Sequence, residues 1–175
     1  MGREGPGGSL GTRLSGGNIL GGWRRTFGDG SDAQLRVYYD RTHRDDPSFV
    51  DDLDTFDVDA QHRFGAGELL GAEHEVTWGV NFRYTDNENV GKGVIRLEPA
   101  SSTDSVFSAF VQDQMELNDA VQLTLGSKFE HNDYSGFEVQ PSVRATWNIA
   151  PGRALWGAVA RAVRIPTRLE RDIAV

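Results

Sequence analysis

The sequence predicts an all-β fold, an antiparallel up-and-down meander of about eight long strands. Apolar and polar residues alternate with a period of two along most of the 175 residues, which is the pattern of strands with one apolar and one polar face. The connections between these segments alternate between short, turn-forming sequences and longer polar ones, as in consecutive hairpins. We expect residues 1–15 to form a flexible or poorly defined segment and residues 16–175 to form the sheet.

The first four strands are expected over residues 16–27, 32–43, 53–64 and 73–86. The first alternates poorly, whereas the other three place their apolar residues two positions apart. A helix would scatter these residues around its circumference, but a strand gathers them on one face. The apolar positions of the second to fourth strands are Leu35, Val37, Tyr39, Phe56, Val58, Ala60, Phe64, Val76, Trp78, Val80, Phe82 and Tyr84.

The last four strands are expected over residues 103–117, 120–132, 137–149 and 153–163. The alternation is complete over 137–149, is interrupted by Phe110 in 103–117, and is poor in 153–163. The apolar positions of the first three of these strands are Phe107, Ala109, Val111, Met115, Leu117, Val121, Leu123, Leu125, Phe129, Phe137, Val139, Pro141, Val143, Ala145, Trp147 and Ile149.

The connections alternate in length along the chain. Outer-membrane barrels have short periplasmic turns and longer external loops. If that rule applies here, residues 44–52 and 87–102 face the outside of the cell. In a whole barrel, the loops near 44–52, 87–102 and 164–175 would help to select a ligand. The connections expected to be short are 28–31, 65–72, 118–119 and 151–152, and those expected to be longer are 44–52, 87–102 and, less extended, 133–136.

Strand length favours a membrane-spanning barrel over a soluble one. A tilted bilayer crossing needs about 9 to 11 residues, whereas strands in globular proteins most often have about 5 or 6. Aromatic residues such as Trp23, Tyr39 and Trp147 lie near strand ends, where rings settle at lipid headgroups. Two alternatives stay open: a complete outer-membrane barrel of eight strands, and a soluble lipocalin-like barrel with its apolar face inside.

The polar strand face carries both signs of charge, as expected of residues that line a wet barrel interior. Candidates for this lumen-facing set are Arg83, Lys128, Glu130, Glu138, Gln140 and Arg144. Candidates for the external loops, which would help to select a ligand, are Asp45, Asp46, Asp51, Asp52, Asn89, Lys92 and Arg96.

Composition excludes several classes of function. The net charge of -8 opposes binding to nucleic acid, and the lack of cysteine excludes disulfides and thiolate metal sites. The sequence has neither a nucleophile elbow nor a phosphate-binding loop, so we expect no enzymatic activity. The aspartates of residues 45–59 lack the glycine-centred spacing of a calcium loop, and the four histidines lie on separate segments. We therefore expect no metal site and no cofactor.

Four segments resemble the barrel of TonB-dependent outer-membrane receptors. Three of them lie in the predicted strands and their connections: residues 106–114 (VFSAFVQDQ), 123–136 (LTLGSKFEHNDYSG) and 140–147 (QPSVRATW). The fourth, residues 158–170 (AVARAVRIPTRLE), is similar to the Arg-x-Pro-Ser/Thr-x-x-Glu segment of that family. They occur in the family's order and spacing, whereas residues 16–86 fit it through strand pattern alone.

The resemblance implies part of a plugged transmembrane barrel of 22 strands in the outer membrane of a Gram-negative bacterium. Such receptors import scarce nutrients, for example ferric siderophores, and their partners are the lipid bilayer, a plug domain, TonB and the small ligand. The sequence departs from the family in having about eight strands, no plug or TonB-contacting segment, and no C-terminal aromatic strand. We therefore expect an internal fragment or an incomplete gene model.

Overall fold

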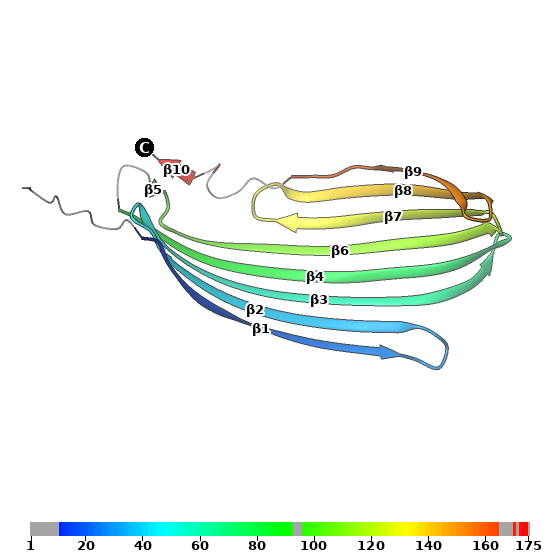
Figure 1. The fold of residues 1–175 in the computed structure, drawn as a ribbon, viewed down its shortest axis with the longest axis horizontal. Coiled ribbons are helices and arrows are strands. Elements are labelled where there is room, and N and C mark those ends of the chain that lie inside the picture. The colour runs from blue at the N-terminus through cyan, green and yellow to red at the C-terminus, as the bar shows by residue number, and fades with distance from the viewer. Residues whose placement is uncertain (1–10, 93–95, 165–169, 171, 175) are drawn as a thin grey trace, which may run out of the picture.

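A computed structural model of the chain describes residues 11–92, 96–164, 170 and 172–174. Eight strands form one antiparallel sheet in the order β1-β2-β3-β4-β6-β7-β8-β9, so neighbours in the sheet are also neighbours along the main meander (Figure 1). The predicted all-β meander is confirmed. The eight strands are β1 Arg13–Thr26, β2 Asp32–Asp45, β3 Phe49–Leu69, β4 Ala72–Gly91, β6 Ser101–Asn118, β7 Val121–Asn132, β8 Gly136–Ala150 and β9 Arg153–Ala160.

Two short strands were not expected from the sequence. β5 (Arg96–Leu97) follows β4 and pairs with β10 (Ile173–Ala174) in a separate two-stranded sheet. Each has only two residues, which is too short for any alternation to show. Part of the predicted 87–102 connection and part of the predicted 164–175 loop are therefore paired with each other.

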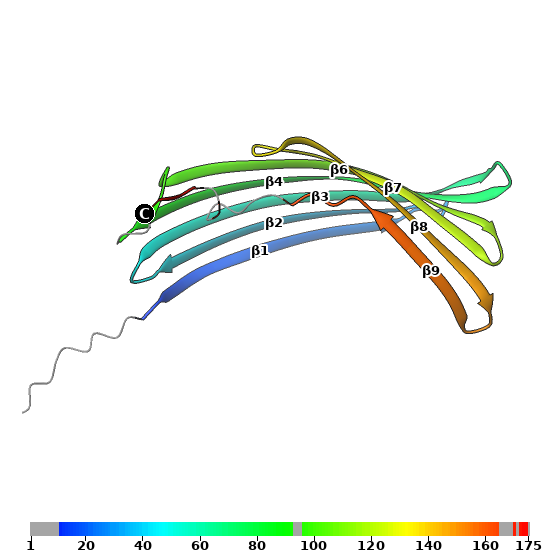
Figure 2. The ribbon, with the colours of Figure 1, turned by 90° about the horizontal axis from the view of Figure 1, so that it is seen from above.

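The large sheet is a single bent layer (Figure 2). Among the described residues, Ala72 is the only buried hydrophobic residue, whereas large apolar side chains such as Phe107 and Trp147 are about half exposed. A globular domain instead buries its apolar side chains between two layers. The apolar side of this sheet therefore needs a cover from outside the described chain.

β3 and the strands on either side of it extend further than predicted, at both ends of β3. β2 continues to Asp45 and β3 begins at Phe49, so the predicted 44–52 loop is a tight turn over residues 46–48. Likewise β3 continues to Leu69 and β4 begins at Ala72. The predicted 65–72 connection is therefore a two-residue turn, in which Leu70 and Gly71 both have positive φ, as a type I′ hairpin requires.

These boundary errors have a physical cause. A bulge between Gly65 and Gly67 breaks the alternation, but the β3–β4 ladder resumes beyond it. At the other end, polar residues occupy both faces of the extended strands, so backbone pairing continues without any hydrophobic period. The sequence pattern reports which face is apolar, not where the ladder stops.

The two outer strands also differ from their predicted spans. β1 begins at Arg13, before the expected start at residue 16, and residues 1–10 of the expected 1–15 segment lie outside the described part of the chain. β9 ends at Ala160 instead of residue 163. No helix among the described residues is long and apolar enough to cross a bilayer.

Candidate functional site

The ladder register divides the sheet into two chemically distinct faces. Opposite residues of an antiparallel pair point to the same side, so each register pair belongs to one face. The apolar face holds pairs such as Phe56–Tyr84, Val80–Ala109 and Phe129–Val139. The polar face holds pairs such as Asp57–Arg83, Gln114–Thr124 and Lys128–Gln140.

The apolar face carries a band of hydrophobic side chains, which we call the apolar belt. On β3 the belt runs from Phe56 to Phe64, and on β4 from Val76 to Tyr84. These spans match the roughly 9 to 11 residues of a transmembrane strand. Directly beyond Phe56 and Tyr84, the same face continues with Asp54 opposite Asp86. The belt therefore has a sharp edge at which carboxylates replace apolar side chains.

Aromatic rings lie along both edges of the belt. At the edge next to the acidic residues, Tyr39 is the register partner of Phe56, which in turn pairs with Tyr84. At the other edge, the ring of His62 stacks on Phe64 at 5.4 Å and meets Trp78 edge-on at 6.2 Å, between ring centroids. This two-edged arrangement is that of the aromatic girdles of outer-membrane barrels.

Two polar side chains interrupt the belt on β6 and β7. Asp113 lies on the apolar face and its Oδ2 is 2.8 Å from Nδ1 of His74. The other carboxylate oxygen of Asp113 and the hydroxyl of Ser127 are buried without a hydrogen-bond partner. The imidazole of His74 also lies 3.1 Å from the carbonyl oxygen of Leu69, which orients the ring beside the carboxylate.

The polar face is organised by ion pairs between adjacent strands. The guanidinium of Arg83 lies 2.9 Å from Oδ2 of Asp57, and Asn81 donates to the other oxygen of that carboxylate at 3.2 Å. Arg63 lies 3.1 Å from Glu75. Further pairs join Arg24 to Asp32 at 2.9 Å and Arg36 to Asp59 at 3.6 Å. Opposite charges thus face each other across the sheet instead of pointing separately into solvent.

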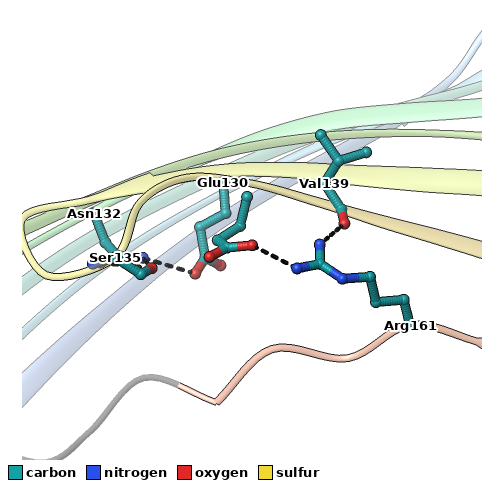
Figure 3. A network of polar contacts seen from close by, with 6 residues as sticks. Glu130, Asn132, Ser135, Val139 and Arg161 are labelled. Carbon is teal, nitrogen blue, oxygen red and sulfur yellow. Dashed lines mark hydrogen bonds and ion pairs between the residues drawn. The ribbon is translucent and has the colours of Figure 1, made fainter.

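A second polar cluster joins β7, β8 and the residue after β9 (Figure 3). Glu130 is buried and stands directly opposite Glu138 in the ladder. Like charges in that position repel each other. Lys128 Nζ lies 2.6 Å from Glu130 and Arg161 Nη2 lies 2.9 Å from Glu138, so each carboxylate has its own cation. Asn132, which is almost fully buried, donates to Glu130 at 3.4 Å.

The register places all six predicted lumen candidates on the polar face, namely Arg83, Lys128, Glu130, Glu138, Gln140 and Arg144. Lys128, Glu130, Glu138 and Gln140 form two adjacent register pairs. Arg83 belongs instead to the cluster around Asp57, and Arg144 is apart from both clusters. That this face lines a lumen stays a prediction.

The predicted external-loop candidates gather at one end of the sheet, which we call the hairpin end, but most of them are strand residues. Asp45, Asp51, Asp52 and Asn89 lie within β2, β3 and β4, Asp46 lies in the turn, Lys92 follows β4, and Arg96 lies in β5. Their expected placement in long loops over 44–52 and 87–102 is therefore wrong for the strand residues, because the ladder continues past the apolar belt.

Hydrogen bonds hold these strand extensions together. One oxygen of Asp51 accepts from Asn87 Nδ2 at 2.9 Å and from Asn89 Nδ2 at 3.0 Å, and both asparagines are buried. Lys92 forms an ion pair with Asp45, and its N–H donates to the carbonyl of Ser48 at 2.8 Å. The turn between β2 and β3 is thus fastened to the end of β4.

Donated hydrogen bonds lower the pKa of two turn carboxyls. Asp46 accepts from the N–H of Ser48 and from the hydroxyl of Thr12, and these bonds favour its charged form. Asp133, in the turn between β7 and β8, accepts from both the N–H and the hydroxyl of Ser105 on β6, which lowers its pKa in the same way. Both carboxylates therefore fasten a turn to a neighbouring segment.

Sequence reasoning missed the asparagines that complete these clusters. Asn81, Asn87 and Asn132 each donate to a carboxylate two residues away or on an adjacent strand. Their polar positions in the alternation are the only signal, and it does not name a partner. Within the described ranges, no group of three or more His, Asp or Glu is arranged to hold a metal ion.

Comparison with known proteins gives one family and one fold. The family model described as TonB dependent receptor-like, beta-barrel, matches residues 3–173. The crystal structure of the siderophore receptor PirA from Pseudomonas aeruginosa is similar, with a TM-score of 0.78 and 18% identity over 89% of this chain. The PirA receptor from Acinetobacter baumannii has a TM-score of 0.78 and 17% identity over 89%. This chain covers 28% and 26% of those two chains. No curated protein matches it.

Proposed function

The chain belongs to the TonB-dependent receptor β-barrel family, and we propose that it forms part of the barrel wall of an outer-membrane receptor for the active uptake of a scarce nutrient such as a ferric siderophore. The observation that carries the proposal is the division of one bent sheet into an apolar belt and an ion-paired polar face. The two similar structures are of siderophore receptors, which supports the choice of ligand class.

In this proposal the apolar face contacts the lipid bilayer of a Gram-negative outer membrane. The belt has the length of a tilted crossing and is bordered by rings on both edges. In water, a sheet with half-exposed Phe, Trp and Val over one whole face would aggregate. Contact with lipid would prevent this aggregation, because the apolar side chains of this face need no hydrogen-bonding partner.

The polar face then lines the lumen and the hairpin end faces the outside of the cell. The lumen holds a plug domain, and TonB couples the receptor to the energy supply, as the family implies. Arg83, Lys128, Glu130, Glu138, Gln140 and Arg144 are the proposed lumen wall. The proposed external set near the ligand entrance is Asp45, Asp46, Asp51, Asp52, Asn89, Lys92 and Arg96.

The two alternative barrels fit the structure less well. A closed barrel of eight strands would pair the first strand with the last, but β1 and β9 stand at opposite ends of the sheet order and share no ladder among the described residues. A lipocalin-like barrel would also have to close, and it would expose the ion-paired clusters and enclose the belt. The open sheet and the family match favour a segment of a larger wall.

Two measurements on the complete receptor test the proposal. The first is uptake of radioactive iron from a panel of siderophores, under iron limitation, by cells with and without the receptor gene. We expect uptake of at least one siderophore to require both the receptor and TonB. Surface exposure of the protein without uptake of any substrate from the panel or of related nutrients would contradict the assigned function.

The second measurement tests orientation. The chain has no cysteine, so a single Asp46→Cys substitution at the hairpin end gives a unique label site within it. We expect a membrane-impermeant maleimide to label Asp46→Cys in intact cells and not Asp119→Cys, which lies in the turn between β6 and β7 at the opposite end. The reverse labelling pattern would overturn the orientation.

A further inference from the structure

In the described sheet, β4 and β6 are the only neighbouring strands that no tight turn joins. They lie side by side (Figure 1), but the chain between them runs over residues 92–100 and includes β5, which pairs with β10. The other neighbours are joined by short turns, for example Leu70–Gly71 and Pro151–Gly152. A short turn fixes the register of its two strands, so another feature must set the register of β4 against β6.

The apolar belt fixes this register only to within an even number of residues. A slip by one residue would turn every apolar side chain of β6 to the polar face. A slip by two residues keeps apolar residues opposite each other, since Val80, which pairs with Ala109, would then face Phe107 or Val111. The belt therefore does not distinguish the observed register from the two registers that are offset by two residues.

Ion pairs on the polar face do not distinguish these registers either. Among the described residues, no ion pair on that face joins β4 to β6. Arg83 of β4 pairs with Asp57 and Glu75 of β4 pairs with Arg63, and both partners lie on β3. These charges hold β4 to β3 and leave its register with β6 unspecified.

The ring of Phe110, the residue that interrupts the alternation of β6, lies on the polar face opposite Gly79 of β4. Gly79 is buried, and a Cβ atom there would lie 2.6 Å from Cε1 of Phe110 and 2.8 Å from the carbonyl oxygen of Ala60. The ring thus fills space that is open only because this position is glycine. In the two offset registers the ring would stand opposite Thr77 or Asn81, whose own side chains would occupy that space.

A second contact acts on the apolar face of the same ladder. Oδ2 of Asp113 on β6 lies 2.8 Å from Nδ1 of His74 on β4, and its other carboxylate oxygen is already buried without a partner. In one offset register Asp113 would stand opposite Trp78 and lose the imidazole, which would leave a carboxylate unpaired in the belt. In the other offset register it would stand opposite His74 itself. This contact therefore opposes one slip, whereas Phe110 opposes both.

We propose that the packing of Phe110 against Gly79 sets the register of β4 against β6, and that the contact between Asp113 and His74 additionally excludes one of the two slips. The register of each ladder contributes to the shear of a barrel, which together with the number of strands fixes the strand tilt and the diameter. The two contacts thereby help to set the width of the lumen. This inference rests on the proposed function, because it requires the sheet to be part of a closed barrel wall.

Disulfide trapping in the complete receptor reads this register directly. Four polar-face positions form a square in the ladder, with Glu75 opposite Gln114 and Thr77 opposite Gln112. The chain has no cysteine, so Thr77→Cys with Gln112→Cys reports the observed register. Glu75→Cys with Gln112→Cys, the first offset pair, and Thr77→Cys with Gln114→Cys, the second offset pair, report the two slips. Diagonal positions lie about 7–8 Å apart, too far for a disulfide, so we expect mild oxidation in outer membranes to link only the opposite pair.

Removing the ring should permit one slip before the other. We expect Phe110→Ala to raise the yield of the first offset pair about fivefold relative to the opposite pair, because one cross-strand contact against that slip is lost. The second offset pair should stay low in Phe110→Ala, since the carboxylate of Asp113 still opposes that slip, and should rise when Asp113→Ala is added. Phe110→Leu, which keeps an apolar side chain without a planar ring, repeats the measurement if Phe110→Ala does not insert into the membrane.

Two variants separate the register from general stability. Phe110→Tyr keeps the ring, and Val111→Ala removes apolar side-chain volume from the same strand on the other face, so both should retain the pattern of the unsubstituted receptor. An unchanged first offset pair in the variants that lack the ring, or an equal rise in Phe110→Tyr or Val111→Ala, would overturn the proposal. The crosslinks are read without transport, so a receptor that gives the expected pattern but imports nothing refutes the proposed function and leaves the assignment of the register standing.

Discussion

The two faces of this sheet contain the same backbone and nearly the same number of positions, but they satisfy their side chains in opposite ways. On the polar face many charged groups have an ion-pair partner on a neighbouring strand, as Arg83 has in Asp57. On the apolar face many large side chains are left about half exposed, as Trp147 is. The polar face thus pairs many of its own charges, whereas the apolar face exposes side chains that lipid would cover in the proposed function.

The comparison shows that the alternation of apolar and polar residues indicates the surroundings of each face of the sheet as well as the positions of the strands. A soluble two-layer protein hides its apolar face within its own fold. Here the described chain supplies no such layer, and in the proposed function lipid covers the apolar face. Substitutions at adjacent positions of one strand, which point to opposite faces, therefore give the sharpest tests of the difference.

The largest expected effect is a charge placed in the centre of the belt. Val143 lies on the apolar face at the middle of β8, and its neighbour Ser142 lies on the polar face. Val143→Arg should reduce folding of the complete receptor into lipid vesicles, with a loss of about 2–4 kcal/mol of unfolding free energy. Urea titration of vesicle-inserted protein measures it.

The matched control for that substitution is Ser142→Arg. It adds the same side chain one position away, on the wet face, where the cost should stay below about 1 kcal/mol. Equal losses for Val143→Arg and Ser142→Arg would mean that the two faces have similar surroundings, and the division into a lipid face and a lumen face would fail.

The next effect concerns the hairpin end, where polar residues lie on both faces. Asp51→Ala should leave the side-chain amide of the buried Asn89 without its acceptor, at a cost of about 1–3 kcal/mol. Hydrogen exchange of the β3 and β4 amides at that end measures the loss. Asp104→Ala is the control, since its longer 3.4 Å contact with Ser102 should change local protection by less than about 0.5 kcal/mol.

The hairpin end also shows where sequence reasoning stops. The belt strands were predictable because apolar residues such as Phe56, Val58 and Ala60 recur at every second position and so lie on one face. Asp51, Asn87 and Asn89 have no such period, because polar residues lie on both faces of these strand ends, and their bonds join residues 36 and 38 positions apart. A ladder sustained by hydrogen bonds alone leaves no hydrophobic signature.

The same limit applies to the clusters on the polar face. The sequence predicted that Lys128, Glu130 and Glu138 share a face, which the register confirms. It did not name Arg161 as the partner of Glu138, because Arg161 lies past the end of β9. A long side chain can reach around a sheet edge, and no periodicity encodes that.

A smaller effect is expected from acid at the β7–β8 turn. The pKa of Asp133 is lowered from 3.8 by the bonds from Ser105. The stabilisation from the hydrogen bonds between Ser105 and the Asp133 carboxylate is therefore fully present above pH 3.8. It is lost as the pH falls through the lowered pKa of Asp133. Exchange of the Ser105 amide should accelerate over that range relative to its intrinsic rate.

Two variants control for general acid unfolding. Asp133→Asn should remove the acid-dependent step in Ser105 exchange, because the turn no longer carries the charge that is lost. Asp119→Asn, in the turn at the opposite end, should leave the step in place. A step that persists in Asp133→Asn would show that another group ties the turn to β6.

The smallest expected effect comes from an exposed ion pair on the polar face. Arg36 and Asp59 lie 3.6 Å apart, and the arginine side chain is 60% exposed. A double-mutant cycle with Arg36→Gln and Asp59→Asn should give a coupling energy below about 0.5 kcal/mol, because water screens the pair and two side chains lose freedom to form it. Such a result would mean that this pair adds little stability and that charge is merely tolerated on a wet surface. A coupling above about 2 kcal/mol would instead place Arg36 and Asp59 in a dry environment, and the polar face would then be in tight contact with another protein surface along β2 and β3.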